Sequence, residues 1–203
     1  MVQTKMENKA YSIKGDTIII NRELTKLDLF VKEFLDILKK HSKYLVVSGF
    51  VSISTGRTRG TEDVDVLFEK MDRAKFSVLL EDLLKHKFWC YQGDTLDEIW
   101  KYLKNRESIR FAKENELFPN IEFIPVDNSR PAKYFELNHP QKIKIQEFEF
   151  KIPPLEFEIL YKEIILAGKK DIEDARHLRV FFSEIIKKER FKEYEPIIKK
   201  ELK

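Results

Sequence analysis

Two aspartates one residue apart, Asp63 and Asp65, are the residues of this sequence best suited to chemistry. They lie in and beside the apolar run 64–68, VDVLF, which has the composition of a buried strand. Residues two apart in a strand point to one face, so both carboxylates project together while Val64 and Val66 point into the core. Two adjacent carboxylates repel each other, and a divalent cation removes that repulsion. Because Mg²⁺ prefers one or two carboxylates together with phosphate oxygens, the pair predicts a site for Mg²⁺ or Mn²⁺ and a phosphorylated ligand.

A second feature precedes the aspartates: Ser48 and Gly49 separate an expected strand, 44–47, from an expected short helix, 49–55. Free backbone N–H groups and the helix dipole at such a junction favour an anion such as a triphosphate. A glycine lets the backbone approach the phosphates without a side chain in the way. One alternative for the aspartates stays open, because acids on the outer face of an exposed edge strand need no ligand.

A third acid, Glu122, lies in the apolar run 120–126, NIEFIPV, which we expect to be another strand. A half-buried strand normally tolerates no acid between residues such as Ile121 and Phe123, so the exception indicates a function. Glu122 would serve as a base for an acceptor hydroxyl or as a ligand of a second metal ion. Asp127 competes for this role, but it lies in a VDNSRP turn, where aspartate commonly caps the backbone.

The run 48–65, SGFVSISTGRTRGTEDVD, resembles the signature of the DNA polymerase β-like nucleotidyltransferase superfamily. In that signature a strand is followed by Gly-Gly or Gly-Ser, a short helix, a glycine, Arg-x-Thr and Asp-x-Asp. Ser48 stands where the first glycine of the pair is usual, which affects the details of the phosphate contacts. The residues that match in order and without gaps are Gly49, Gly56, Arg59, Thr61, Asp63 and Asp65.

The segment 150–178 resembles the helical part of AbiEii-like and related uncharacterised prokaryotic nucleotidyltransferases. There a hairpin and a proline lead to an apolar helix with an embedded lysine, then to Lys-Asp-x-x-Asp. The resemblance implies that Lys162 reaches the nucleotide phosphates, that Asp171 and Asp174 lie near the cleft, and that an antitoxin-like partner protein is possible. Ordinary roles stay open, because helix lysines extend to solvent and acids favour helix N-termini.

These features predict a metal-dependent nucleotidyltransferase that moves a nucleoside monophosphate from an NTP, such as ATP, to an acceptor hydroxyl and releases pyrophosphate. The acceptor is left open among a small molecule such as an antibiotic, a tRNA end and a protein side chain. The alternatives are a nucleotide- or RNA-binding module without turnover, which would gain little from three acids, and a toxin-type enzyme controlled by a partner. The expected catalytic and metal-binding residues are Asp63, Asp65 and Glu122, and the expected nucleotide-binding residues are Ser48, Gly49, Arg59 and Lys162.

The spacing of apolar residues predicts an α/β (α+β) fold with a mixed sheet, flanked by helices and followed by a helical lobe. We expect a catalytic domain over 1–152 and a C-terminal helical lobe over 153–203, because Pro153 and Pro154 interrupt the pattern. The stretch 88–119 is less regular apart from one helix. The expected elements are hairpins over 11–20 and 142–152, strands over 44–47, 64–68 and 120–126, and helices over 25–38, 49–55, 72–84, 96–103 and from 155 onward.

Composition excludes several classes of function. In 203 residues, 38 basic residues against 35 acidic ones give a net charge of +3, too small for a protein that coats duplex DNA. No apolar run approaches the roughly 20 residues of a membrane span, and the first residues contain no apolar signal core. A single cysteine, Cys90, cannot form an internal disulfide and is expected to be buried packing, and the histidines lack metal-ligand spacing. We therefore expect a soluble, cytoplasmic protein.

Overall fold

The computed structural model describes residues 9–202, and its centre is a five-stranded mixed sheet in the order β3-β4-β7-β6-β5. The central strands β4 and β7 are parallel, whereas every other neighbouring pair in this sheet is antiparallel. Residues 1–8, at the start of the expected catalytic domain, lie outside the described residues, as does residue 203 at the end of the expected lobe. The strands are β3 (Tyr44–Val46), β4 (Asp63–Glu69), β5 (Phe88–Cys90), β6 (Ile109–Lys113) and β7 (Asn120–Val126).

A second sheet of four strands joins the beginning of the chain to its later part, in the order β1-β2-β8-β9. Two hairpins form it, and β2 pairs in parallel with β8, so that Ile18 lies opposite Ile143 and Ile20 opposite Ile145. All four isoleucines are buried, because alternate residues of both strands face the same core. The strands are β1 (Tyr11–Lys14), β2 (Thr17–Ile20), β8 (Gln141–Ile145) and β9 (Phe148–Ile152).

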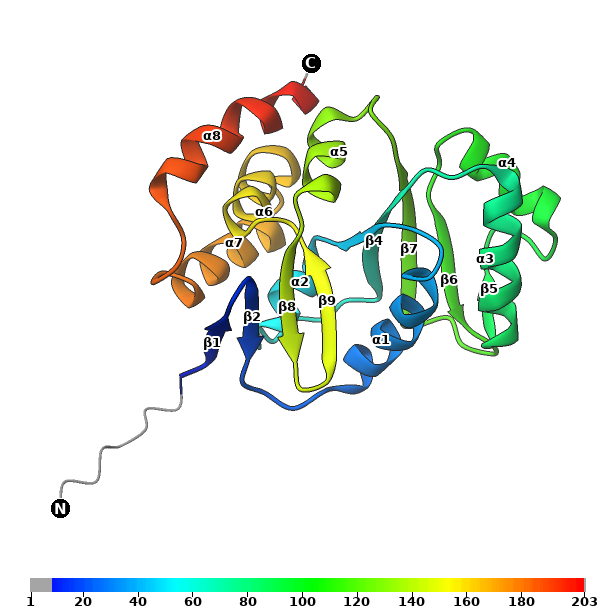
Figure 1. Ribbon diagram of the computed structural model, residues 1–203, viewed down its shortest axis with the longest axis horizontal. Coiled ribbons are helices and arrows are strands. Elements are labelled where there is room, and N and C mark those ends of the chain that lie inside the picture. Colours follow the sequence, from blue (N-terminus) through cyan, green and yellow to red (C-terminus); the bar gives the residue numbers. More distant parts are fainter. Residues whose placement is uncertain (1–8, 203) are drawn as a thin grey trace.

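Helices surround the two sheets, and Figure 1 shows α6, α7 and α8 gathered at one end of the molecule with α3 and α4 at the other. None of the helices within residues 9–202 is long and apolar enough to cross a membrane. The helices are α1 (Lys26–Leu38), α2 (Gly49–Ser54), α3 (Arg73–Lys85), α4 (Leu96–Lys104), α5 (Pro131–Asn138), α6 (Leu155–Tyr161), a π-helical turn (Lys162–Leu166), α7 (Lys169–Phe181), α8 (Lys188–Ile198) and a 3₁₀ turn (Lys199–Leu202).

One face of the five-stranded sheet packs on α1 through aromatic side chains. Phe34 of α1 contacts Phe88, Phe111 and Phe123 of three strands, with ring centroids 5.3 to 5.8 Å apart. Thr25 begins this helix with a capping box that it forms with Asp28, which fixes where the apolar stripe starts. Because side chains alternate along a strand, the residues next to these phenylalanines point to the opposite face.

The α/β fold class with flanking helices is confirmed, and most of the expected elements are present. The structure differs from expectation in two respects: the strands form two sheets, and β5, β6 and α5 had not been predicted. β5 has only three residues, and charged residues interrupt the apolar pattern of β6, so neither shows a clear period. The domain boundary at residue 153 stays a prediction.

Candidate functional site

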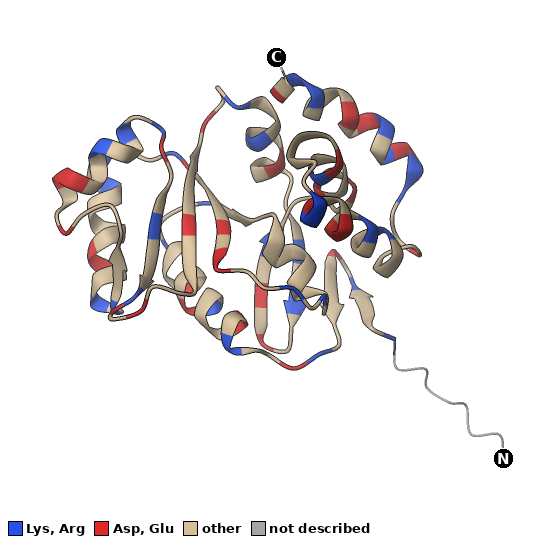
Figure 2. Ribbon diagram, turned by 180° about the vertical axis from the view of Figure 1, so that it is seen from behind, with Lys and Arg blue, Asp and Glu red and all other residues tan. Residues whose placement is uncertain are grey.

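Three acids lie together on the face of the sheet that α1 does not cover. In the parallel register of β4 and β7, Asp65 lies directly opposite Glu122, and Asp63 lies two pairs further toward the start of β4, opposite Asn120. All three acids are half-buried, whereas Val64 and Val66 are fully buried on the other face. Figure 2 shows acidic segments side by side on adjacent strands. The sequence-based expectation that these carboxylates share a face agrees with this register.

Asp65 is the acid most affected by its surroundings. Burial, together with the negative charges of Asp63 and Glu122, raises the pKa of its carboxyl from 3.8 to about 6, while Ser48 and Lys133 act in the opposite direction. A carboxyl that is half-buried beside two other acids carries charge that its protein surroundings do not balance. Asp63 and Asp65 therefore fit a divalent cation, whose charge would stabilise both ionised carboxylates.

Glu122 also has partners of its own within the sheet. Ser108 Oγ donates a hydrogen bond of 2.7 Å to Glu122 Oε1, and Arg110 Nη2 donates one of 2.8 Å to Oε2. Arg110 lies opposite Glu122 on β6, so the row Asp65, Glu122, Arg110 crosses three strands. Within residues 9–202, no group of three or more His, Cys, Asp or Glu side chains is arranged to hold a metal ion. The guanidinium of Arg110, rather than a cluster of acids, orients the carboxylate of Glu122.

Asp127, the competing acid, caps its own turn. Its Oδ1 accepts hydrogen bonds from the backbone N–H of Ser129 at 2.9 Å and from the Ser129 hydroxyl at 2.5 Å. These hydrogen bonds lower the pKa of the Asp127 carboxyl. Lys70 and Arg106 lie within ion-pair distance of the same side chain. Asp127 is therefore already satisfied by the turn and by two surface cations.

Ser48 and Gly49 form the tight junction that leads from β3 into α2. Ser48 has a left-handed backbone with φ of 62°, a conformation that glycine adopts more readily, which matches the position where the superfamily signature has glycine. At Gly49, an added Cβ would lie 3.0 Å from the guanidinium of Arg59. The absence of a side chain at Gly49 therefore allows Arg59 to lie against the backbone of this junction.

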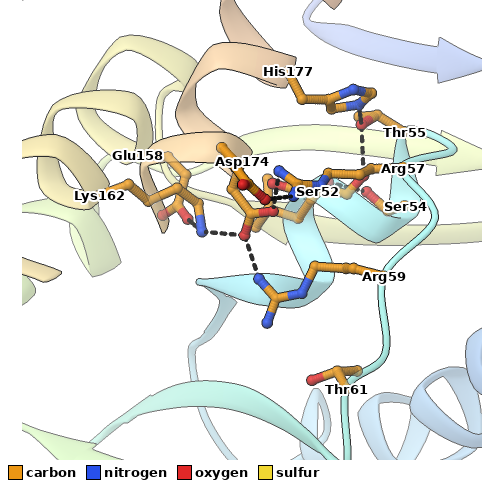
Figure 3. Close-up of polar contacts among 12 residues, drawn as sticks. Ser52, Ser54, Thr55, Arg57, Arg59, Thr61, Glu158, Lys162, Asp174 and His177 are labelled. Atoms are coloured by element: carbon orange, nitrogen blue, oxygen red, sulfur yellow. Dashed lines mark hydrogen bonds and ion pairs between the residues drawn. The ribbon is translucent and has the colours of Figure 1, made fainter. Parts of the chain in front are cut away.

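Asp174 is the centre of a buried polar network that joins the loop before β4 to the helices of the C-terminal part. Figure 3 shows Arg57, Arg59 and Lys162 converging on its carboxylate. Arg57 Nη1 lies 2.9 Å from Oδ1, Lys162 Nζ lies 3.2 Å from Oδ2, and Arg59 Nη1 donates a hydrogen bond to Oδ2. Asp174 is fully buried, so these contacts balance its charge.

Lys162 is also fully buried, and its Nζ lies 3.2 Å from Oε1 of Glu158 as well as from Asp174. This placement contradicts the alternative of a lysine that extends to solvent. Whether Lys162 also binds phosphate stays a prediction. Asp171 occupies the first turn of α7, where its carboxylate lies close to Gly168, which agrees with the role of a charge at a helix N-terminus.

Beside Asp65 is a cavity of about 190 Å³, called here the Ser48 cavity, whose lining includes Ser48, Asp65, Arg130, Lys133 and Tyr161. Sequence reasoning missed Lys133 because it lies on α5, which shows no clear period. The available signal was the position of a lysine and an arginine shortly after the strand that bears Glu122. The cavity brings two cationic side chains close to the acids.

Lys133 is held in this cavity by contacts on two sides. Its Nζ lies 2.8 Å from Oε1 of the buried Glu136 and 3.7 Å from the ring centroid of Tyr161. Burial favours the neutral lysine, but the interactions of Lys133 with Glu136, Tyr161 and Glu158 together outweigh burial and raise the pKa of Lys133. Burial also raises the pKa of Glu136 to about 7, which Lys133 opposes. Lys133 is therefore a charged ammonium fixed near Asp65.

On the other side of the acids is a second hollow of about 480 Å³, called here the Asp63 cavity. Its lining is polar and consists of Arg59, Gly60, Thr61, Glu62, Asp63 and Lys170. The acids therefore lie between two cavities, with Asp65 lining the first and Asp63 the second. Such an arrangement provides room for two reactants on either side of a charged centre.

Comparisons with known proteins were made by sequence and by structure. No family model matches this chain, and no curated protein matches it. The lincomycin-bound lincosamide antibiotic adenylyltransferase LnuA has a similar structure, with a TM-score of 0.51 and 14% identity over 79% of this chain and 99% of that chain. An antigenic nucleotidyltransferase-like protein from Paracoccidioides brasiliensis gives a TM-score of 0.53 and 14% identity over 87% of this chain and 88% of that chain.

This chain has the nucleotidyltransferase fold. One similar structure is described as an adenylyltransferase and the other as nucleotidyltransferase-like, and each matches most of this chain and most of its own length. At 14% identity the likeness concerns the fold and leaves the activity open. The narrower resemblance to AbiEii-like proteins stays a prediction.

Proposed function

We propose that this protein transfers a nucleoside monophosphate from an NTP to a hydroxyl group of an acceptor. The observation that carries the proposal is the row of acids on β4 and β7, with Asp65 opposite Glu122 and Asp63 on the same face. In the reaction, the acceptor oxygen bonds to the α-phosphorus while the bond from that phosphorus to the bridging oxygen breaks. Pyrophosphate leaves with the electron pair of that bond.

The aspartates and the glutamate have different parts in this reaction. Asp63 and Asp65 would hold Mg²⁺ or Mn²⁺, which supplies positive charge against the phosphates when it is bound. Glu122 would accept the proton of the acceptor hydroxyl or complete a second metal site. Arg110 supports both roles, because its hydrogen bond of 2.8 Å orients the Glu122 carboxylate.

The donor nucleotide is proposed to bind at the Ser48 cavity. Ser48 and Gly49 would present backbone N–H groups to the phosphates, and Arg130 and Lys133 add positive charge in the same cavity. Arg59 lies against the backbone of Gly49 and also lines the Asp63 cavity. The phosphate contact implied for Lys162 stays a prediction, which has to account for its ion pairs with Glu158 and Asp174.

Among the possible acceptors, we propose a small molecule. LnuA is described as an adenylyltransferase of lincosamide antibiotics, and its structure was determined with lincomycin bound. The small net charge of +3 also gives little support for a long RNA acceptor.

A screen of labelled NTPs against small-molecule, RNA and protein acceptors, with Mg²⁺ or Mn²⁺, tests the proposal. Label should pass to an acceptor, and Asp63→Asn and Asp65→Asn should abolish transfer. Glu69→Gln is the matched control, because Glu69 lies on the same strand at its other end. Calorimetry should show that NTP affinity falls on chelation, since the acids then repel the triphosphate. Equal transfer by the asparagine variants contradicts the proposal.

A specific observation favours a second candidate, a nucleotide-binding module without turnover. Glu122 is already paired with Arg110 and Ser108, and no three-acid metal cluster is formed among residues 9–202. Such a module would bind NTP in the Ser48 cavity without releasing pyrophosphate. Measurement of pyrophosphate release during the acceptor screen separates the two candidates.

A further inference from the structure

A hollow of about 750 Å³, called here the α1 cavity, lies between the first half of α1 and the segment 113–119. Leu27, Leu29 and Phe30 line it from α1, and Phe118 and Pro119 line it from the segment before β7. Small-molecule sites in proteins usually have volumes of about 300 to 1,000 Å³ and mostly apolar walls. The α1 cavity therefore has the size and the wall chemistry of a site for a small molecule.

Apolar side chains in this cavity remain open to solvent. Leu29 is 51% exposed and Phe118 is 53% exposed, although neighbouring Phe30 is buried in the core. Single exposed apolar side chains are common on protein surfaces. Large exposed apolar side chains that gather around a cavity are instead typical of ligand sites. An apolar body placed against Leu29 and Phe118 would remove both from water.

The α1 cavity is connected to the acids through the segment that precedes β4. Thr61 and Glu62 line both the α1 cavity and the Asp63 cavity. The hydroxyl of Thr61 donates a hydrogen bond of 2.7 Å to the backbone oxygen of Asp63 and lies 3.4 Å from its carboxylate Oδ1. A molecule seated in the α1 cavity and extending over Thr61, around the edge of the sheet where β4 begins, would thus reach Asp63 from the side opposite the Ser48 cavity.

The charges around the α1 cavity disfavour an anionic ligand. Lys113 is paired with Glu33, so these two side chains balance each other. Of the remaining charged residues that line the cavity, the carboxylates of Glu62 and Glu116 have no ion-pair partner within residues 9–202, and they outnumber the ammonium of Lys26. A phosphodiester chain would be repelled by this balance, whereas an uncharged or cationic molecule would not.

We propose that the α1 cavity binds the acceptor, and that the acceptor is a small hydroxyl-bearing molecule with an apolar body and no negative charge. The inference rests on the proposed function, because it assigns the second substrate of the same reaction. The apolar body lies between Leu29 and Phe118, and the hydroxyl extends over Thr61 to the acids. Glu122 then takes the hydroxyl proton as the oxygen bonds to the α-phosphorus of the NTP, the bond from that phosphorus to the bridging oxygen breaks, and pyrophosphate leaves.

The first test measures the cavity without any reaction. Prodan, an uncharged naphthalene fluorophore, is titrated against the full chain and against Leu29→Asp, Phe118→Asp and Val78→Asp. Val78 is the matched control, because it is 54% exposed on α3 and does not line the cavity. Saturable binding that falls about tenfold or more in the first two variants and is retained in the third supports the proposal. Absent binding, or equal binding by all four proteins, overturns it.

The second test separates this inference from the proposed function. Labelled NTP and Mg²⁺ are supplied with a panel of uncharged, cationic and anionic amphiphilic alcohols. The proposal expects label on uncharged or cationic members, competition between them and prodan, and a rise in acceptor KM in Leu29→Asp with NTP affinity unchanged. Transfer to an alcohol with the same KM in Leu29→Asp overturns the cavity assignment while the proposed function stands. Label found only on RNA or protein overturns the small-molecule assignment.

Loss of all transfer has a separate meaning. If neither alcohols nor macromolecules accept label, the proposed function fails, and the acceptor role assigned to the cavity fails with it. Prodan binding that is still lost in Leu29→Asp would then leave only a ligand pocket. Thermal melts of each variant show whether the fold is intact, which is expected because Leu29 and Phe118 are exposed.

Discussion

Asp65 and Glu122 lie opposite each other on the parallel strands β4 and β7, on the face of the sheet that α1 leaves uncovered. Parallel neighbours bring residues that are far apart in the chain to the same level of a sheet, so the two acids meet without any loop to place them. Rigid strands hold catalytic groups more precisely than loops do. The electrostatic cost of this arrangement falls mainly on Asp65, whose carboxyl has a pKa of about 6.

The first prediction concerns the stability of Asp65→Asn in the presence of a chelator. The folded carboxyl has a pKa of about 6, raised from the ordinary 3.8, so the folded state loses stability as pH rises from the lower to the higher value. Asparagine has no such ionisation. Above pH 6 the variant should therefore be more stable than the wild type, by up to about 3 kcal/mol for a shift of this size. Urea unfolding across pH checks this.

Two results complete this prediction. The difference between the proteins should disappear as pH falls below 3.8, because Asp65 of the wild type then holds its proton in both the folded and the unfolded state. Added Mg²⁺ should stabilise the wild type at pH 8 and leave Asp65→Asn almost unchanged. Equal stability of both proteins at pH 8 under chelation would show that Asp65 is not strained by its neighbours.

The second prediction concerns Glu122→Gln, which preserves the shape of the side chain but removes its charge. Turnover should fall about 100-fold or more if Glu122 takes the acceptor proton, since general base catalysis typically contributes that much. Affinity for NTP should change little, because Glu122 is proposed to act on the acceptor. Steady-state kinetics, with Glu69→Gln as the control, would show whether turnover falls while NTP affinity is retained. A loss of NTP affinity at unchanged turnover would place Glu122 in nucleotide binding instead.

Glu122→Gln also has an effect that does not depend on activity. The charge of Glu122 is one cause of the raised pKa of Asp65, so its removal should lower that pKa. The stability loss described for Asp65 should then be smaller and should end at a lower pH in this variant. An unchanged pH profile of unfolding would show that the two carboxylates are not coupled.

The third prediction concerns Lys133→Met. If the ammonium of Lys133 contacts the donor phosphates in the Ser48 cavity, its removal should lower NTP affinity about tenfold or more. The corresponding nucleoside, which has no phosphates, should bind equally well to both proteins. Lys32→Met serves as the control, because Lys32 forms an ordinary surface pair with Asp36. Calorimetry with NTP, NMP and nucleoside measures how the loss of affinity depends on the number of phosphates. An equal loss of affinity for all three ligands would contradict a phosphate contact.

Local patterns made part of this site predictable from sequence. The shared face of Asp63 and Asp65 follows from the two-residue period of a strand, and Ser48 with Gly49 follows from an expected strand-to-helix junction. Glu122 was identified because an acid is unusual in an apolar strand. Each of these inferences uses only residues close together in the chain.

Long-range contacts account for what the sequence did not reveal. Arg59 and Asp174 are 115 residues apart, and no local period indicates that they meet. Lys133 belongs to a short helix that begins with Pro131, and its position beside Asp65 depends on how α5 packs after β7. The burial of Lys162 likewise depends on how α7 packs, because Asp174 comes from α7, whereas Glu158 lies only one turn before Lys162.

The last prediction separates Lys162 from Asp174 within their buried network. Asp174→Asn removes the negative charge that Arg57, Arg59 and Lys162 all contact, so it should lower the free energy of unfolding by about 3 to 5 kcal/mol, as for other broken buried pairs. Lys162→Met should cost less, because Asp174 keeps both arginines. The paired variant Glu158→Gln/Lys162→Met removes one charge of each sign and should recover part of that loss.

NTP affinity then decides the role of Lys162 in binding. Lys162→Met should weaken NTP binding, through a lost phosphate contact or through loosened support of Arg59 beside Gly49. The two causes differ in the paired variant: a phosphate contact stays lost, whereas support of Arg59 should partly return together with stability. Calorimetry at a temperature where every variant is folded measures both outcomes. Unchanged NTP affinity in Lys162→Met would remove this lysine from the nucleotide site and leave it a purely structural part of the network.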